Sequence, residues 1–359
     1  MTRHFELPAV AGAVDPSDML GRISEFPRQI RDAWKLIQQP ETPLPDSQGI
    51  RSVLVLGMGG SAIGGDLVAG LVAGQCRVPV SVHRDYGLPG WVDEHTLVVA
   101  SSYSGGTEET LSGWDEAGRR GARRVAMTTG GELAERAQGQ GEPLIRFDYK
   151  AQPRAALGYG FTLLLGLLAR LGLVPDTGLE KAVEALENAD FLQSDPEEPG
   201  RPAELANWLK GGIPVILASA HLGAVARRWT TQINENSKAW AFWNEYPELN
   251  HNVVVGLENP ESLRRATEGR DPGLLRVIHL ESAEYHPQTR KRMEITRELM
   301  ERAGFEVRTL RAEPAPGPLA EMLNLIWLGD LVSYRLAAAY ATDPTPVDVI
   351  TELKNRLKD

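Results

Sequence analysis

The sequence predicts an α/β protein with two doubly wound αβα domains, mainly parallel sheets, an N-terminal helical arm and a C-terminal helix. Three observations predict this class. Between residues 51 and 150, short β-branched runs alternate with helical periodicities. A second alternating block follows residue 201. The chain, at 359 residues, is long enough for two hydrophobic cores. We expect an N-terminal helical arm at 1–50, a first domain at 51–152, connecting helices at 153–200, a second domain at 201–342 and a C-terminal helix at 343–359.

Local signals support the elements of the first half. In the arm, Asp15 can cap a helix that Pro27 interrupts, and a second apolar stripe runs on to Pro40. The alternating block that follows is typical of a five-stranded doubly wound layer. Strands are predicted at 52–57, 78–83, 96–101, 123–128 and 143–147, and helices at 61–74, 107–120 and 131–138.

The second half repeats this pattern. Residues 153–195 are predicted to be helical, and the leucines at 163–168 are too apolar for a surface helix, so they are expected to pack between two layers. The acidic, proline-containing stretch at 195–202 is typical of a domain boundary. In the tail, Thr345 is predicted as an N-cap, with Pro346 in the first turn and Asp348 three residues after the cap. Strands are predicted at 213–219, 252–257, 275–280 and 305–311, and helices at 222–238, 286–303 and 317–341.

Composition excludes several classes of protein. The net charge of −10 argues against nucleic acid as the main partner. A single cysteine, Cys76, excludes a disulfide framework and a thiolate metal cluster. No apolar stretch approaches the roughly 20 residues of a membrane helix, and the first residues lack the apolar core of a secretory signal. We therefore expect a cytoplasmic protein without a membrane partner.

Two glycine- and serine-rich loops are the most informative feature. Each follows a predicted strand and opens a predicted helix, the first from Gly57 and the second from Ser101. Glycine permits close approach of the backbone to a ligand, and helix N-termini favour anions. Because neither loop contains a lysine, the pattern indicates a cradle for one phosphate of a small molecule rather than a nucleoside triphosphate site. The candidate phosphate-binding residues are Gly59, Gly60, Ser61, Ser102, Ser104 and Thr107.

The first loop also fits the dinucleotide fingerprint Gly-x-Gly-x-x-Ala. That interpretation requires an acidic residue about 20 positions further on, at the end of the second strand. The nearest candidate, Asp85, lies 28 residues after Gly57. The serine-rich second loop has no place in a dinucleotide site, so nicotinamide binding is the minor alternative.

Two further segments carry candidate chemical groups. Glu235 lies between Asn234 and Asn236, whose side chains prefer caps and turns, within an otherwise helical stretch. His251 lies in a loop before the predicted strand at 252–257. From residue chemistry alone, Glu235 is more often expected on a solvated helix face, and His251 is more often expected to have a structural role. No two of the seven histidines have ligand spacing on one element, so no metal site is expected.

Taken together, five segments resemble the bifunctional phosphoglucose/phosphomannose isomerases of the sugar isomerase (SIS) domain superfamily. The resemblance extends from about residue 15 to 358 and follows the family's order. It implies two SIS domains, a homodimer with active sites near the dimer interface, and no cofactor. The segments are 57–61, 101–110, 153–159, 234–238 and 247–252.

The resemblance also implies roles for individual residues. Glu235 matches the family's catalytic base, and His251 matches a ring-opening histidine supplied by the neighbouring subunit. Arg154 matches an arginine beside the reacting carbons, and Lys354 a lysine that assists at the ring oxygen. Thr345 matches a threonine linked to dual specificity, although its capping role explains it equally well.

These residue types fit aldose–ketose isomerisation through a cis-enediol. One carboxylate can move a proton between C2 and C1, and an arginine can stabilise the enediolate. The expected activity is metal-independent interconversion of glucose 6-phosphate and mannose 6-phosphate with fructose 6-phosphate. Two rivals remain, namely an SIS isomerase or epimerase for another phosphosugar and a non-catalytic sugar-phosphate sensor. The sensor is disfavoured because residues 1–50 do not resemble a basic DNA-binding helix-turn-helix.

Overall fold

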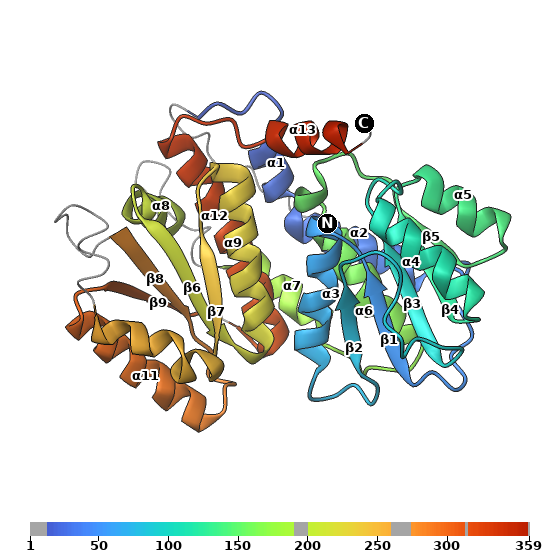
Figure 1. Ribbon diagram of the computed structural model, residues 1–359, viewed down its shortest axis with the longest axis horizontal. Helices are drawn as coiled ribbons and strands as arrows, with labels where there is room; N and C mark the ends of the chain where they lie inside the picture. Colours follow the sequence, from blue (N-terminus) through green and yellow to red (C-terminus); the bar gives the residue numbers. More distant parts are fainter. Residues whose placement is uncertain (1–12, 190–199, 260–273, 313–314, 358–359) are drawn as a thin grey trace. The chain divides into compact units, whose positions relative to one another are not determined.

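The computed structural model describes residues 13–189, 200–259, 274–312 and 315–357, which group into two compact units (Figure 1). Unit 1 is built on Glu25–Glu187 with Pro316–Ala320, and unit 2 on the remainder of the described chain. The predicted boundary stretch at 195–202 lies mostly outside the described residues. Within the described parts, no helix has the length and apolarity to cross a membrane.

Unit 1 contains a five-stranded parallel sheet, as the sequence predicts. The strand order is β2-β1-β3-β4-β5, so the chain reverses its direction of travel between β1 and β3. In such sheets, ligands bind beyond the carboxyl ends of the strands at this switch point. The strands are β1 (Ser52–Leu56), β2 (Val80–His83), β3 (Thr96–Ser101), β4 (Arg123–Thr128) and β5 (Leu144–Arg146).

Successive side chains of a strand point to opposite faces of the sheet, and in these strands both sets are apolar. Helices therefore cover both faces. Leu54 and Leu56 pack with Trp114 under α4 (Glu108–Arg119) and α5 (Gly131–Gly139). On the opposite face, Val55 lies against Gly65 of α3 (Gly59–Val72).

A second helical layer lies outside α3. The helix α6 (Leu157–Arg170) is buried along most of its length between α3 and α2 (Phe26–Gln38), which explains its run of leucines. The prediction that the leucines at 163–168 pack between layers is therefore confirmed. The short helix α7 (Leu179–Glu187) follows, and its Glu187 pairs with Arg31 of α2.

Unit 2 contains a four-stranded parallel sheet in the order β7-β6-β8-β9. Its switch point lies between β6 and β8. The strands are β6 (Ile213–Ser219), β7 (Phe242–Tyr246), β8 (Leu275–Leu280) and β9 (Glu306–Leu310). The helices are α1 (Met19–Ser24), α8 (Arg201–Leu209), α9 (Gly223–Ser237), α11 (Pro287–Arg302), α12 (Pro318–Ala339) and α13 (Asp348–Arg356). The first residues of α12, up to Ala320, belong to unit 1.

The predicted strand at 252–257 is wrong. Those residues form a 3-10 segment, η5 (Val253–Glu258), and the strand β7 lies ten residues earlier. The valines suggested a buried strand, but Val253 and Val255 are exposed, and the Asn252 side chain accepts a hydrogen bond from the Val253 amide. The true strand is an edge strand with mixed aromatic and polar residues, so it has a weak sequence signal.

The two predicted helix caps had different outcomes. Asp15 caps α1 as predicted, accepting hydrogen bonds from the amides of Met19 at 2.8 Å and Leu20 at 3.0 Å. Thr345 is not an N-cap, because α13 begins at Asp348. The Thr345 amide instead donates to Asp343 at 2.8 Å, so a local turn there displaces the expected capping geometry.

A buried histidine makes the stability of unit 2 dependent on pH. His279 on β8 has no solvent exposure, and burial lowers its pKa from 6.5 to about 4, with Arg297 acting in the same direction. Its ring packs edge-on against Tyr246. Because the folded state holds the ring neutral while the unfolded chain binds a proton, stability is complete above pH 6.5 and falls toward pH 4.

We expect acidification over this range to reduce the free energy of unfolding by about 3 kcal/mol, since each pKa unit corresponds to about 1.4 kcal/mol. Urea unfolding at a series of pH values measures this loss. The variant His279→Leu should show a shallower dependence on pH, and an unchanged slope in that variant would assign the acid sensitivity to other groups.

Candidate functional site

The two glycine- and serine-rich loops lie side by side at the carboxyl ends of β1 and β3. These strands are hydrogen-bonded neighbours, so the loops that follow them meet at the switch point of the first sheet. The Tyr103 amide donates to the Ser61 hydroxyl at 3.1 Å and joins the two loops. The structure therefore brings together the two loops that carry the predicted phosphate-binding residues of unit 1. Thr345, which is also predicted to contact the substrate, lies in unit 2.

Hydrogen bonds inside the second loop distinguish its hydroxyl groups. Ser102 is buried, its hydroxyl lies 3.0 Å from that of Thr107, and it accepts from the Gly105 amide at 3.1 Å. Ser104 is exposed, and its hydroxyl accepts a longer 3.3 Å bond from the Gly106 amide. Ser102 and Thr107 therefore stabilise the loop shape, whereas Ser104 lies at its surface.

Gly105 is required by the loop geometry. Its φ of +71° is in the left-handed region, and a Cβ there would lie 1.9 Å from the Gly130 carbonyl oxygen. The Gly105 carbonyl in turn accepts from the Leu133 amide at 2.8 Å, near the start of α5. The loop is therefore fixed in shape by the neighbouring β4–α5 connection.

Arg154 lies beside the first loop, although 94 residues separate it from Gly60. The two backbones touch, since a Cβ on Gly60 would come within 2.9 Å of the Arg154 amide nitrogen. Arg154 belongs to the 3-10 segment η1 (Pro153–Ala155) and is buried. Buried Gln29 holds this segment by donating to the Ala155 carbonyl at 2.8 Å. The backbone of the Arg154 segment is thus packed against the N-terminus of α3, an end of a helix that favours an anion.

Glu235 lies in unit 2, in the last turn of α9. The asparagines beside it do not interrupt the helix, which continues to Ser237 and ends where Lys238 adopts φ +53°. The Asn236 side chain donates to Ser333 of α12 at 2.9 Å, and the Asn234 side chain accepts from the Ala241 amide at 3.0 Å. Both asparagines therefore use their side chains to fix the helix end that carries Glu235.

A buried polar stripe between α9 and α12 continues this anchorage. Arg228 donates to Asp330 through two bonds, of 3.1 Å and 2.8 Å, and burial raises the pKa of Asp330 while Arg228 opposes that change. Sequence reasoning missed this stripe. Its signal was present, because Arg228, Gln232 and Asn236 recur at intervals of four on an otherwise apolar face.

Glu235 lines a cavity of about 850 Å³ in unit 2. The cavity lies between the end of α9, the segment leading into β7 and the start of α13. Several of its large apolar side chains are exposed, among them Trp240 at 78 % and Val349 at 80 %. These aromatic and aliphatic lining residues were not predicted from the sequence. They include Trp240, Phe242, Trp243, Val349 and Ile350.

The other predicted residues of unit 2 occupy different positions. Thr345 directly precedes Pro346, which lines the cavity beside Glu235. Lys354 is exposed on α13, one turn beyond Ile350 and outside the cavity lining. His251 is exposed at the end of the 3-10 segment η4 (Glu248–His251) and does not line this cavity. Glu235, Thr345 and the start of α13 are thus grouped, and His251 is not grouped with them.

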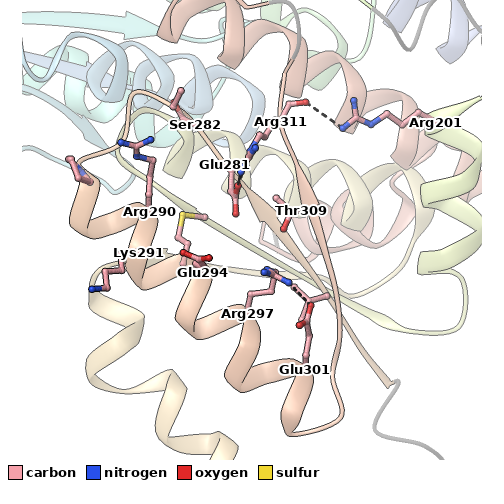
Figure 2. Close-up of a pocket in the computed structure, with 14 residues that line it drawn as sticks. Arg201, Glu281, Ser282, Arg290, Lys291, Glu294, Arg297, Glu301, Thr309 and Arg311 are labelled. Atoms are coloured by element: carbon pink, nitrogen blue, oxygen red, sulfur yellow. Dashed lines mark hydrogen bonds and ion pairs between the residues drawn. The ribbon is translucent and has the colours of Figure 1, made fainter.

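A larger cavity of about 1200 Å³ lies on unit 2 between α11 and β9 (Figure 2). Two ion pairs, Arg311–Glu281 and Arg297–Glu301, neutralise part of its charge. It contains none of the residues that the sequence predicts for chemistry. We therefore assign one candidate site to the loops of unit 1 and another to the Glu235 cavity of unit 2.

Two parallel αβα units, the first with glycine- and serine-rich loops at the switch point of its sheet, fit a protein of the SIS-domain class. Residues 200–357 match the family described as bacterial phospho-glucose isomerase C-terminal SIS domain. A hypothetical protein of known structure from Thermus thermophilus has a TM-score of 0.70 and 19% identity, over 96% of this chain and 91% of that chain. This likeness concerns the fold.

Relatives of similar sequence show the family to which the chain belongs. A bifunctional phosphoglucose/phosphomannose isomerase from Caldicellulosiruptor bescii is 40% identical over 95% of this chain and 99% of its own length. A D-glucosamine-6-phosphate 4-epimerase from Sulfolobus acidocaldarius is 33% identical over 63% of this chain and 71% of its own length. The chain belongs to the bifunctional phosphoglucose/phosphomannose isomerase family.

Proposed function

We propose that this protein is a metal-independent isomerase that interconverts glucose 6-phosphate and mannose 6-phosphate with fructose 6-phosphate through a cis-enediol. The observation that carries the proposal is the pairing of family membership with the lysine-free cradle of unit 1, in which Arg154 lies against Gly60. Neutral hydroxyls and backbone amides suit a single phosphate monoester on a small molecule.

The proposed roles follow from the chemistry of each residue. Glu235 takes the proton from C2 and returns it at C1 as general base and then acid. Arg154 stabilises the enediolate oxygen, and His251 exchanges protons at the ring and anomeric oxygens. Lys354 assists at the ring oxygen, and Thr345 contributes to the choice of C2 configuration. Phosphate anchoring by Gly59, Gly60, Ser61, Ser102, Ser104 and Thr107 turns binding energy into positioning of C1 and C2.

We further propose a cytoplasmic homodimer built from two SIS domains, at 51–152 and 201–342. The exposed apolar side chains around the Glu235 cavity and on α13 support an interface there, because contiguous apolar patches on a protein surface mark interaction sites. His251, exposed on η4 and away from the Glu235 cavity of its own chain, is available to a neighbouring copy. Sedimentation analysis of the purified chain tests the dimer.

We expect fructose 6-phosphate incubated with the enzyme in D₂O to yield both glucose 6-phosphate and mannose 6-phosphate, with deuterium at C2 of each. The enediol can present either face to one carboxylate if the C2–C3 bond rotates while the phosphate stays anchored. NMR of the product mixture measures both sugars and their labelling.

Other outcomes separate the rival functions. If deuterated glucose 6-phosphate is the sole product, the enzyme is a phosphoglucose isomerase without dual specificity. Turnover of a different phosphosugar, with these three inert, would favour an isomerase or epimerase of another specificity. Binding of hexose 6-phosphates without turnover would favour a sensor.

A further inference from the structure

Lys238 belongs to the segment 234–238 that the sequence singles out, yet the proposed mechanism gives it no role. It is the C-cap residue of α9 and adopts the left-handed conformation, with φ +53° and ψ +32°. Helices that end in this conformation generally place glycine there, because a side chain makes the conformation unfavourable. A non-glycine residue in this conformation is uncommon, and the contacts of the lysine side chain are therefore of interest.

The contacts of Lys238 join two parts of unit 2. Its Nζ donates to the backbone carbonyl oxygen of Glu235 at 2.5 Å and to that of Pro344 at 3.2 Å. Pro344 is buried and directly precedes Thr345. One ammonium group therefore connects the turn of α9 that carries Glu235 to the segment that leads into α13.

The helix that follows this segment, α13, is exposed along its length. The helix α13 contains no buried residue, and its apolar side chains Val349, Ile350 and Leu353 are all exposed. The cavity beside Glu235 is closed on one side by residues 346–350. The position of this wall relative to Glu235 therefore depends on the connection through Pro344.

We propose that Lys238 is a positioning residue that sets the placement of Glu235 relative to Thr345 and the first turn of α13. The inference rests on the proposed isomerase function. It adds a residue that supports catalysis, because the Lys238 side chain reaches backbone carbonyls on both sides of the cavity. Its ammonium group acts by donating hydrogen bonds to the carbonyl oxygens of Glu235 and Pro344, without taking part in proton transfer.

Three substitutions separate the ammonium group from the backbone conformation. Lys238→Met keeps the aliphatic stem and removes the donors, and Lys238→Gly removes the side chain but also relieves the left-handed strain. Lys238→Arg retains donors that can reach both carbonyls. The matched control is Lys210→Met, an exposed lysine of unit 2 outside the cavity lining.

We expect Lys238→Met and Lys238→Gly to lower kcat at least about tenfold with KM changed less than about threefold, because misplacement of a catalytic group mainly reduces the chemical step. Lys238→Arg should keep kcat within about threefold of wild type. Lys238→Gly should unfold at the same temperature as wild type or higher, since glycine suits this conformation. Hydrogen exchange across 345–356 should accelerate in the Met and Gly variants, and Lys210→Met should match wild type throughout.

The inference is overturned if Lys238→Gly retains kcat within about twofold of wild type, a range in which no positioning effect is resolved. It also fails if loss of activity accompanies a lower melting temperature and faster exchange throughout α9, which would indicate a merely structural role. If the wild-type protein does not isomerise hexose 6-phosphates, the proposed function fails separately. Hydrogen exchange at residues 345–356 then still decides whether Lys238 connects the end of α9 to the segment that leads into α13.

Discussion

Glu235→Gln is expected to reduce kcat by about 10²- to 10⁴-fold while leaving the affinity for hexose 6-phosphates nearly unchanged, because an amide keeps the size of the side chain but cannot accept a proton. The fold should survive, since Glu235 is only partly buried and the helix end is held by Asn234 and Asn236. Coupled assays measure turnover, and calorimetry with fructose 6-phosphate measures binding.

The matched control is Glu294→Gln. Glu294 is an exposed carboxylate that lines the larger cavity of the same unit, so its loss should leave kcat at the wild-type level. Activity of Glu235→Gln within about tenfold of wild type would remove Glu235 from the mechanism, since loss of a general base usually has a larger effect.

The same variant tests the proposed contribution of His251 from a second copy. Glu235→Gln and His251→Gln subunits, each inactive alone, should regain activity when mixed and allowed to exchange, because a mixed dimer holds one site with both native residues. Failure to complement, in a mixture shown to exchange subunits, would place both residues in the site of a single chain.

Gly105→Ala is expected to lower kcat/KM by about 100-fold, because it disrupts the phosphate cradle and so the positioning of the sugar. The added Cβ would lie 1.9 Å from the Gly130 carbonyl oxygen, and the φ of +71° is unfavourable for alanine. The loop must therefore shift, with loss of the bond that the Gly105 amide donates to the Ser102 hydroxyl and of the bond that the Gly105 carbonyl accepts from the Leu133 amide. Steady-state kinetics on fructose 6-phosphate and thermal unfolding measure the two consequences.

Gly106→Ala is the control within the same loop. Among the described residues, no atom beyond the two chain neighbours lies within 4 Å of a Cβ built at Gly106, and its φ lies outside the left-handed region. We expect kinetics and stability close to wild type. If Gly105→Ala kept wild-type kinetics despite a measured loss of stability, the phosphate would have to bind elsewhere.

Local chemistry explains why much of the fold was predictable. The strands of the first sheet are short apolar runs bounded by turn residues, and each was found within about two residues of its expected bounds, which is the usual uncertainty of such boundaries. The Asp15 cap was found because a carboxylate can satisfy the free amides of the next turn without any distant partner. The loops after β1 and β3 were found for the same reason, since glycine and hydroxyl residues at strand ends are local signals.

The errors occurred where two local signals competed. Thr345 followed by Pro346 is typical of a helix start, but the bond from the Thr345 amide to Asp343 stabilises a turn instead. The valines at 253–255 have high β-propensity, yet a strand also needs a neighbour in the sheet. The position beside β6 is taken by Phe242–Tyr246, so the valines have no partner strand there.

What the sequence by itself determined about this protein is the α/β class, the parallel strands with their two adjacent loops, and the segments that identify the family. The tertiary structure alone decided that Arg154 lies against Gly60, that Glu235 opens into an apolar cavity, and that Lys238 connects the end of α9 to Pro344. The physical reason is the range of the interactions. Propensities, caps and turns depend on neighbours a few residues away, whereas these contacts join residues about 100 positions apart and form only when whole layers pack.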